Sequence, residues 1–181
     1  MTPAFWDTSA LVPLCVQQHP SSAVRELLGQ HEITVWWATS VEIRSAIERL
    51  LRMGQLTQSE HVAAGTRLEQ LRRGWRELQP TETLRAQAEV FLMSYSLKAA
   101  DALQLAAAWT WCSGDAQGYT FISGDAQLLE AARQVGFKVV MALLLAGKWS
   151  SLRRYMRGYR CTYGRTHVLK NPTDHVSCSV Q

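Results

Sequence analysis

Four acidic residues occupy positions that suit metal-dependent chemistry: Asp7, Glu42, Asp101 and Asp125. Each directly follows a predicted strand or falls at the start of a predicted helix. In an open parallel sheet, the carboxyl ends of strands and the N-termini of helices meet at one edge, so we expect the carboxylates to converge there. Converging carboxylates raise one another's pKa unless a cation compensates, and Mg²⁺ and Mn²⁺ prefer carboxylate and water oxygens. Such a site suits hydrolysis of a phosphodiester by metal-activated water.

Each acid alone also has a purely structural explanation. Asp7 and Asp125 fit ordinary N-caps. Glu42 fits the acidic member of a capping box that Thr39 opens, and Asp101 suits the positive end of its helix. A structural Mg²⁺ site is a further alternative. Four acids from four separate segments are more than capping or one structural ion requires, so together they favour the catalytic interpretation.

The elements that would position these acids alternate along the first 141 residues. Apolar and β-branched runs predict strands at 4–6, 33–38, 75–79, 119–122 and 137–141. Helical periodicity, two Thr-x-x-Glu capping boxes and closing glycines predict helices at 21–28, 39–53, 57–73, 83–95, 99–111 and 126–135. Strands separated by helices favour a mainly parallel central sheet covered on both faces, which is a three-layer α/β/α fold.

Four segments surround the acids: FWDTSALV at 5–12, ATSVEI at 38–43, ADALQLAA at 100–107 and FISGDAQL at 121–128. Their order resembles that of a PIN domain. The segment AARQVGF at 131–137 matches the ending of that family. Over residues 3–141 the chain therefore resembles the VapC-type toxin ribonucleases of prokaryotic toxin–antitoxin pairs.

This resemblance implies a PIN-like fold and an endoribonuclease that depends on Mg²⁺ or Mn²⁺ and leaves a 5′-phosphate and a 3′-hydroxyl. It implies that the four acids are the metal-binding and catalytic residues, with the Thr8 and Ser123 hydroxyls as possible support. It also implies an RNA substrate, a small antitoxin that silences the enzyme, and a homodimer. Glu48 lies on the same predicted helix as Glu42 and competes with it, but Glu42 follows the strand more closely. Gly124 departs from the family, which often has a bulkier residue before the last Asp.

The formal net charge of +4 at pH 7 is unevenly distributed. Residues 1–141 carry 12 Lys and Arg and 14 Asp and Glu, a net charge of −2, whereas residues 142–181 carry seven and one, a net charge of +6. We therefore expect a nuclease domain at 1–145 and a poorly ordered basic extension at 146–181. Trp149 and Tyr155, interleaved with arginines, make the extension a candidate RNA contact. An accidental continuation of the reading frame would also explain it.

Two basic residues near the acids, Arg44 and Lys98, are placed to reach an RNA phosphate, and a solvated helix face also explains both. The extension holds four potential zinc ligands without the close Cys–Cys and His–His pairs that structural zinc sites use: Cys161, His167, His175 and Cys178. We interpret these four as incidental.

Two rival functions are also compatible with a strand-end Asp. An aspartyl-phosphate phosphatase usually needs a second Asp two residues after the first, and Ser9 stands there instead. A non-catalytic PIN-like module that binds RNA or a partner would keep the acids as caps. The sequence opens with no signal peptide, has no apolar run that could span a bilayer, and has no close cysteine pair, so we expect a cytoplasmic protein with no membrane contact.

Overall fold

The computed structural model describes residues 1–17 and 22–142, so the predicted basic extension lies outside the described residues. Five strands form one sheet: β1 (Thr2–Trp6), β2 (His31–Trp36), β3 (Arg76–Leu78), β4 (Thr120–Ser123) and β5 (Lys138–Met141). Their order is β3-β2-β1-β4-β5, and every neighbouring pair is parallel. All five predicted strands are therefore present, with ends shifted by at most two residues.

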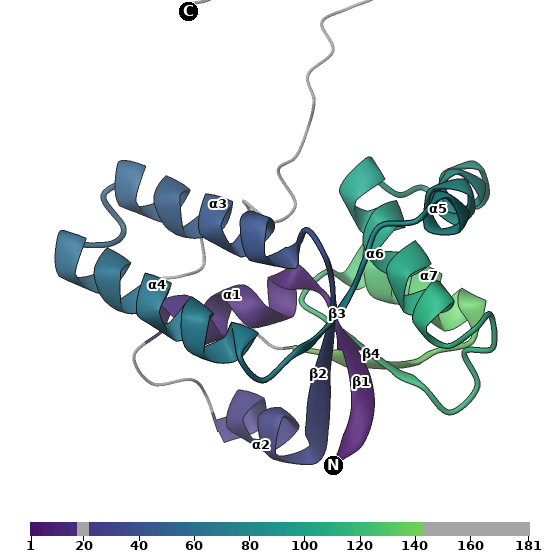
Figure 1. Ribbon diagram of the computed structural model, residues 1–181, viewed down its shortest axis with the longest axis horizontal. Helices are drawn as coiled ribbons and strands as arrows, with labels where there is room; N and C mark the ends of the chain where they lie inside the picture. Colours follow the sequence, from purple (N-terminus) through teal and green to yellow (C-terminus); the bar gives the residue numbers. More distant parts are fainter. Residues whose placement is uncertain (18–21, 143–181) are drawn as a thin grey trace, which may run out of the picture.

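Seven helices connect these strands within the described chain. They are α1 (Thr8–Val16), α2 (Ser22–Gln30), α3 (Thr39–Arg52), α4 (Gln58–Arg72), α5 (Glu82–Ser94), α6 (Ala99–Trp111) and α7 (Ala126–Val135). Helices α1 to α4 lie on one side of the sheet and α5 to α7 on the other (Figure 1). This is the predicted three-layer α/β/α arrangement. None of the helices among the described residues is long and apolar enough to cross a bilayer.

Helix α1 has no counterpart among the predicted helices. All nine of its residues are buried, so it has no polar face and no amphipathic period that a sequence could reveal. It contains Pro13, a residue that argues against a helix interior. Helix α2 also differs from the prediction, because it runs through Gly29 instead of ending before it. Gly29 is not among the glycines with positive φ, the conformation that closes a helix, whereas Gly136 closes α7 at φ +113° as predicted.

One of the two predicted capping boxes is wrong. Thr57 and Glu60 form the expected box at the start of α4. At the start of α3, however, the N-cap is Ala38, and no side chain caps the helix. Thr39 is already the first helical residue, so Glu42 lies one position too far along to return to the cap, and its backbone N–H donates to Ala38 instead. The Glu42 carboxylate is therefore available for another role.

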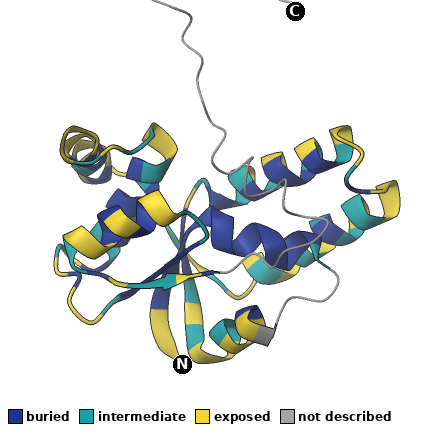
Figure 2. Ribbon diagram, turned by 180° about the vertical axis from the view of Figure 1, so that it is seen from behind, coloured by how far each residue is buried: buried dark blue, intermediate teal, exposed yellow. Residues whose placement is uncertain are grey.

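The buried β1 strand separates two cores of different composition. Ala4 and Trp6 pack with the mainly aliphatic residues of α1, α3 and α4, while Phe5 packs with α5, α6 and α7. On that second side Phe5 stacks on Phe121 of β4 with ring centroids 5.4 Å apart. Figure 2 shows the buried faces of the helices turned toward the sheet. Because β1 is covered on both faces, the residue that follows it emerges in the middle of the molecule.

Candidate functional site

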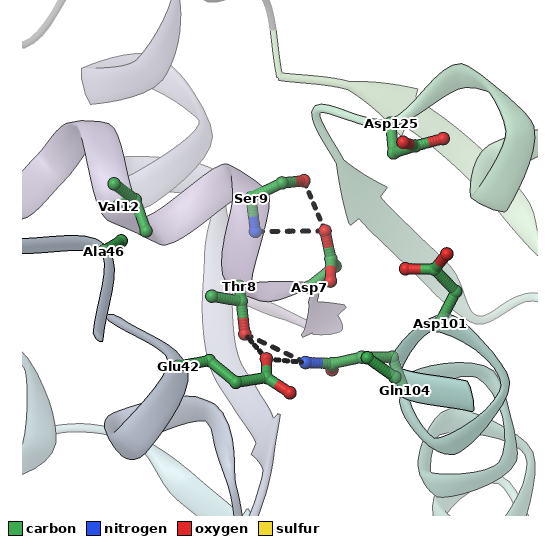
Figure 3. Close-up of a pocket in the computed structure, with 10 residues that line it drawn as sticks. Asp7, Thr8, Ser9, Val12, Glu42, Ala46, Asp101, Gln104 and Asp125 are labelled. Carbon is green, nitrogen blue, oxygen red and sulfur yellow. Dashed lines mark hydrogen bonds between the residues drawn. The ribbon is translucent and has the colours of Figure 1, made fainter. Parts of the chain in front are cut away.

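A cavity of about 220 Å³ lies beyond the carboxyl ends of the central strands, between α1 and α3 on one side and α6 on the other. All four acids singled out by the sequence line it, together with three polar and three apolar residues: Thr8, Ser9, Gln104, Val12, Ala46 and Ala100. Figure 3 shows the carboxylates of Asp7, Asp101 and Asp125 gathered on one side of this cavity and Glu42 below Asp7.

The sheet register explains why acids far apart in the chain meet. Trp6 of β1 pairs with Ile122 of β4, and the Asp7 N–H donates to the Ile122 carbonyl at 2.9 Å. Asp7 then caps α1, and Asp125, after β4, caps α7 through the N–H groups of the following turn. Glu42 and Asp101 come from the first turns of α3 and α6. Asp7 and Asp125 do act as N-caps, but capping uses only some of their oxygens.

Asp7 is held through one of its two oxygens. Its Oδ2 accepts the Ser9 N–H at 3.0 Å, the Ser9 hydroxyl, and the Ser123 hydroxyl at 2.9 Å. Burial, with 6% of the residue exposed, raises the pKa of Asp7 above its usual value, the three hydrogen bonds oppose that shift, and the charge of Asp125 adds to it. The structure gives no hydrogen bond from a described residue to Oδ1, which leaves that oxygen free to bind a ligand.

The two hydroxyls that hold Asp7 are themselves held by backbone amides of the turn between β4 and α7. The Gly124 N–H donates to Ser9 Oγ at 2.7 Å, and the Asp125 N–H donates to Ser123 Oγ at 2.9 Å. A Cβ added at Gly124 would lie 3.2 Å from Ser9 Oγ and 3.4 Å from the Ser9 carbonyl. The glycine noted as a departure from the family pattern therefore allows this close contact. Sequence reasoning missed the role of Ser9.

Glu42 is likewise held through one oxygen. Its Oε2 accepts the Thr8 hydroxyl and the Gln104 Nε2–H, the latter at 2.9 Å. Burial raises the pKa of Glu42, these two hydrogen bonds oppose the shift, and the charges of Asp7 and Asp101 add to it. Thr8 thus lies where the sequence-based prediction of a supporting hydroxyl needs it. Gln104 was not predicted, because a glutamine inside an otherwise apolar helix pattern has no distinctive spacing.

The other two acids are held by backbone amides of their own helices. Asp125 Oδ1 accepts the N–H groups of Gln127 and Leu128 at 2.7 and 3.1 Å. Asp101 receives the Lys98 N–H. Burial raises the pKa of Asp101 from 3.8 to about 6, with further increases from the charges of Asp7 and Asp125, while the nearby Lys98 charge opposes them. The carboxylates therefore repel one another across the cavity.

The basic residues predicted near the site lie in different places. Lys98 occupies the N-cap position of α6, without a side-chain capping bond, and is close enough to lower the pKa of Asp101. Arg44 does not line the cavity: it faces α4, where it pairs with Glu69 at 3.4 Å and its guanidinium lies against Gly65. Glu48, the competitor of Glu42, also faces α4 and contacts His61 at 2.7 Å. Of the two acids on α3, only Glu42 lines the cavity.

The oxygen atoms that line the cavity suit a divalent cation that keeps some of its waters better than one bound entirely by protein ligands. Among the described residues, no group of three or more acidic, histidine or cysteine side chains stands close enough to hold an ion directly. Mg²⁺ commonly keeps several waters and binds through one or two carboxylates, so an open cavity with free carboxylate oxygens suits it. All the ionisable groups that line the cavity are carboxylates, which are hard oxygen ligands.

No protein-family model and no curated protein matches the sequence. Solved structures do match the fold. A chain of FitAcB from Neisseria gonorrhoeae has a TM-score of 0.59 at 19% identity, covering 78% of this chain and 99% of that chain. A toxin–antitoxin complex from Klebsiella pneumoniae gives 0.57 at 14% identity, with coverages of 78% and 99%. VapBC-1 from nontypeable Haemophilus influenzae gives 0.54 at 11% identity, with coverages of 78% and 98%. At these identities the likeness concerns the fold, and the chain has the PIN-like α/β fold that its motifs predict.

Proposed function

We propose that this protein is a Mg²⁺- or Mn²⁺-dependent endoribonuclease and the toxin component of a toxin–antitoxin pair. The observation that carries the proposal is the meeting of four carboxylates from four separate elements around one cavity, two of them held so that one oxygen stays free. Capping accounts for part of the bonding of Asp7 and Asp125 and for none of that of Glu42. A divalent cation compensates such a concentration of negative charge.

A bound cation would lower the pKa of a water, which would then lose a proton more readily and become a better nucleophile for phosphorus, and its charge would stabilise the leaving oxygen. Asp7 and Glu42 would supply ligand oxygens whose orientation the Ser9, Ser123, Thr8 and Gln104 side chains fix. Asp101 and Asp125 would complete the negative lining of the cavity. Without a cation this lining repels a phosphodiester, so the carboxylates themselves make RNA binding at the cavity depend on the metal.

The partners follow from the same proposal. The solved structures that match this fold include a toxin–antitoxin complex and VapBC-1. We therefore propose a small antitoxin protein as the partner that silences the enzyme, and a homodimer as its oligomeric state. Cellular RNA is the proposed substrate, which places the activity in the cytoplasm.

The test compares two acids on the same helix. The full-length protein is purified and assayed for cleavage of a labelled RNA with Mg²⁺, with Mn²⁺ and with EDTA. We expect cleavage with either metal and none with EDTA. Glu42→Gln should abolish it, whereas Glu48→Gln should cleave like the wild type, since Glu48 faces α4 and His61. Equal cleavage by both variants and the wild type would contradict the four-acid site.

The non-catalytic alternative makes the opposite prediction in the same assay. One observation favours this alternative: among the described residues, no cluster of three or more potential metal ligands stands close together. A non-catalytic module would bind RNA or an antitoxin without cleaving RNA in any metal, and Glu42→Gln would leave that binding unchanged. Metal-dependent cleavage that Glu42→Gln abolishes excludes this alternative.

A further inference from the structure

Gln104 is a polar residue in an unusual place for its type. It lies on α6, three residues after Asp101, and only 1% of it is exposed. Its neighbours on the helix, Leu105 and Ala106, are fully buried in the core. Burying an amide costs free energy unless its donors and acceptor find partners. The partners of the Gln104 amide therefore indicate what the residue does.

Both hydrogens of the amide are used at the cavity. Nε2 donates to Thr8 Oγ1 and to Glu42 Oε2, each at 2.9 Å, and the Thr8 hydroxyl donates to the same Oε2 (Figure 3). The three groups form a closed triangle that joins α6, α1 and α3. Every donor in it ends on an oxygen, and Glu42 Oε1 stays outside it.

The other end of the same amide is unsatisfied. Gln104 Oε1 is buried and has no hydrogen-bond partner among the described residues. Turning the amide over would not help, because Oε1 would then face the hydroxyl and carboxylate oxygens that Nε2 now bonds. An apolar side chain of similar size would avoid this unpaired acceptor. The amide thus orients Glu42 but destabilises the surrounding core.

We propose that Gln104 is the positioning residue of Glu42: together with Thr8 it holds Oε2, so that Oε1 remains directed to the cation that the cavity binds. This inference rests on the proposed function. Side chains that orient a metal ligand without touching the metal typically change metal affinity or activity by about 10- to 100-fold when they are replaced. Gln104 meets that description, since its contacts in the site are with Thr8 and Glu42.

The test uses Gln104→Met, which keeps a similar volume and removes the amide. Thr110→Val is the control on the same helix, since that hydroxyl donates to the Ala106 carbonyl of its own helix. Mn²⁺ affinity of the full-length protein is measured by electron paramagnetic resonance without RNA. We expect Gln104→Met to weaken Mn²⁺ binding by roughly 10- to 100-fold and to lower kcat while KM for RNA stays nearly constant. Thr110→Val should match the wild type.

A double variant separates positioning from packing. In a Glu42→Gln background, Gln104→Met should weaken Mn²⁺ binding by less than about twofold further, since its effect passes through Glu42. The melting temperature of the Gln104→Met single variant should stay within about 3 °C of the wild type, because the loss of an unpaired acceptor offsets the lost hydrogen bonds.

Three results would overturn the inference. Wild-type Mn²⁺ affinity in Gln104→Met would do so, as would an undiminished loss in the Glu42→Gln background or an equal loss in Thr110→Val. A wild-type protein that binds no Mn²⁺ is a separate result, because it overturns the proposed function and the role of Gln104 with it.

Discussion

The cavity contains two pairs of acids that are held in different ways. Asp7 and Glu42, the inner acids, are fixed mainly by side chains: the Ser9 and Ser123 hydroxyls hold Asp7, which the Ser9 N–H also contacts, and Thr8 and Gln104 hold Glu42. Asp101 and Asp125, the outer acids, are fixed by backbone amides at the starts of their own helices. The orientation of the inner acids therefore depends on tertiary packing, whereas that of the outer acids depends mainly on local helix geometry.

This difference separates the carboxylates, which carry the negative charge, from the neutral side chains that fix their orientation. A neutral hydroxyl or amide next to an inner acid should matter almost as much as a ligand, because it determines which oxygen is free. Asp125 is held by the backbone N–H groups of Gln127 and Leu128, so substitutions around it should act mainly on helix α7. Differences between variants of the two pairs test this distinction.

The largest effect should come from an inner acid. Asp7→Asn replaces a carboxylate that accepts three hydrogen bonds with an amide that cannot accept them all, so we expect kcat for RNA cleavage to fall by roughly 10³-fold. Asp125→Asn keeps an oxygen that can cap α7, and we expect a fall of only roughly 10- to 100-fold. Single-turnover cleavage rates measure both. Equal losses would remove the distinction between inner and outer acids.

A smaller effect should follow from removing the hydroxyls that hold Asp7. Ser9→Ala and Ser123→Ala should together weaken Mn²⁺ binding by about 10- to 100-fold without changing any charge. Ser94→Ala is the matched control, since that hydroxyl bonds to the Val90 carbonyl on the exposed face of α5. Titration calorimetry with Mn²⁺ measures the affinity of the double variant, the control and the wild type. Wild-type affinity in the Ser9→Ala, Ser123→Ala double variant would show that the hydroxyls do not direct Asp7.

The smallest effect should appear in the pH dependence of stability without metal. The pKa of Asp101 is about 6 in the fold against 3.8 ordinarily, so the folded state holds this proton more tightly than the unfolded state. Its contribution is therefore present below about pH 4 and is lost as pH rises through about 6. Burial shifts the pKa values of Asp7 and Glu42 in the same direction.

The measurement is the free energy of unfolding in urea and EDTA between pH 4.5 and 7.5. The free energy of unfolding of the wild type should fall as pH rises across this range. Asp101→Asn should make that fall smaller by about 1–2 kcal/mol, after allowance for solvent screening at a partly exposed group. Glu48, which is partly exposed, and the exposed Glu130 have pKa values lowered by hydrogen bonds from His61 and Arg133. They contribute in the opposite sense and equally in both proteins. Parallel curves for variant and wild type would contradict the assignment.

Much of the fold follows from sequence because most of its helices have one apolar face. α6 and α7 are found at the residues predicted for them, and Gly136 ends α7 by its left-handed conformation. The exception is α1, which is buried on every side and so has no period to detect. The positions of the four acids were predictable because each falls at a strand end or helix start. The capping box predicted for Thr39 and Glu42 failed because helix α3 begins one residue earlier than that box requires.

The contacts within the site were less predictable. Ser123 and Thr8 adjoin strand ends in the predicted motifs, whereas Ser9 lies in the unpredicted helix α1 and Gln104 lies within α6 and bonds to Glu42, 62 residues away. A single sequence gives the spacing along one helix or strand and does not give which side chains from different elements touch. Arg44 illustrates the same limit, since its place on α3 suggested the cavity and its side chain pairs with Glu69 on α4.

The most direct test of the central claim is Mn²⁺ binding by the purified full-length protein at pH 7.5, compared among the wild type, Asp7→Asn and Asp101→Asn. Glu130→Gln, at an exposed acid paired with Arg133 on α7, serves as the control. We predict that the wild type and Glu130→Gln bind Mn²⁺ alike, and that each of the other two variants loses at least about tenfold in affinity. Binding that is unchanged in both Asp variants, or a wild type that binds no Mn²⁺, would contradict a shared cation site.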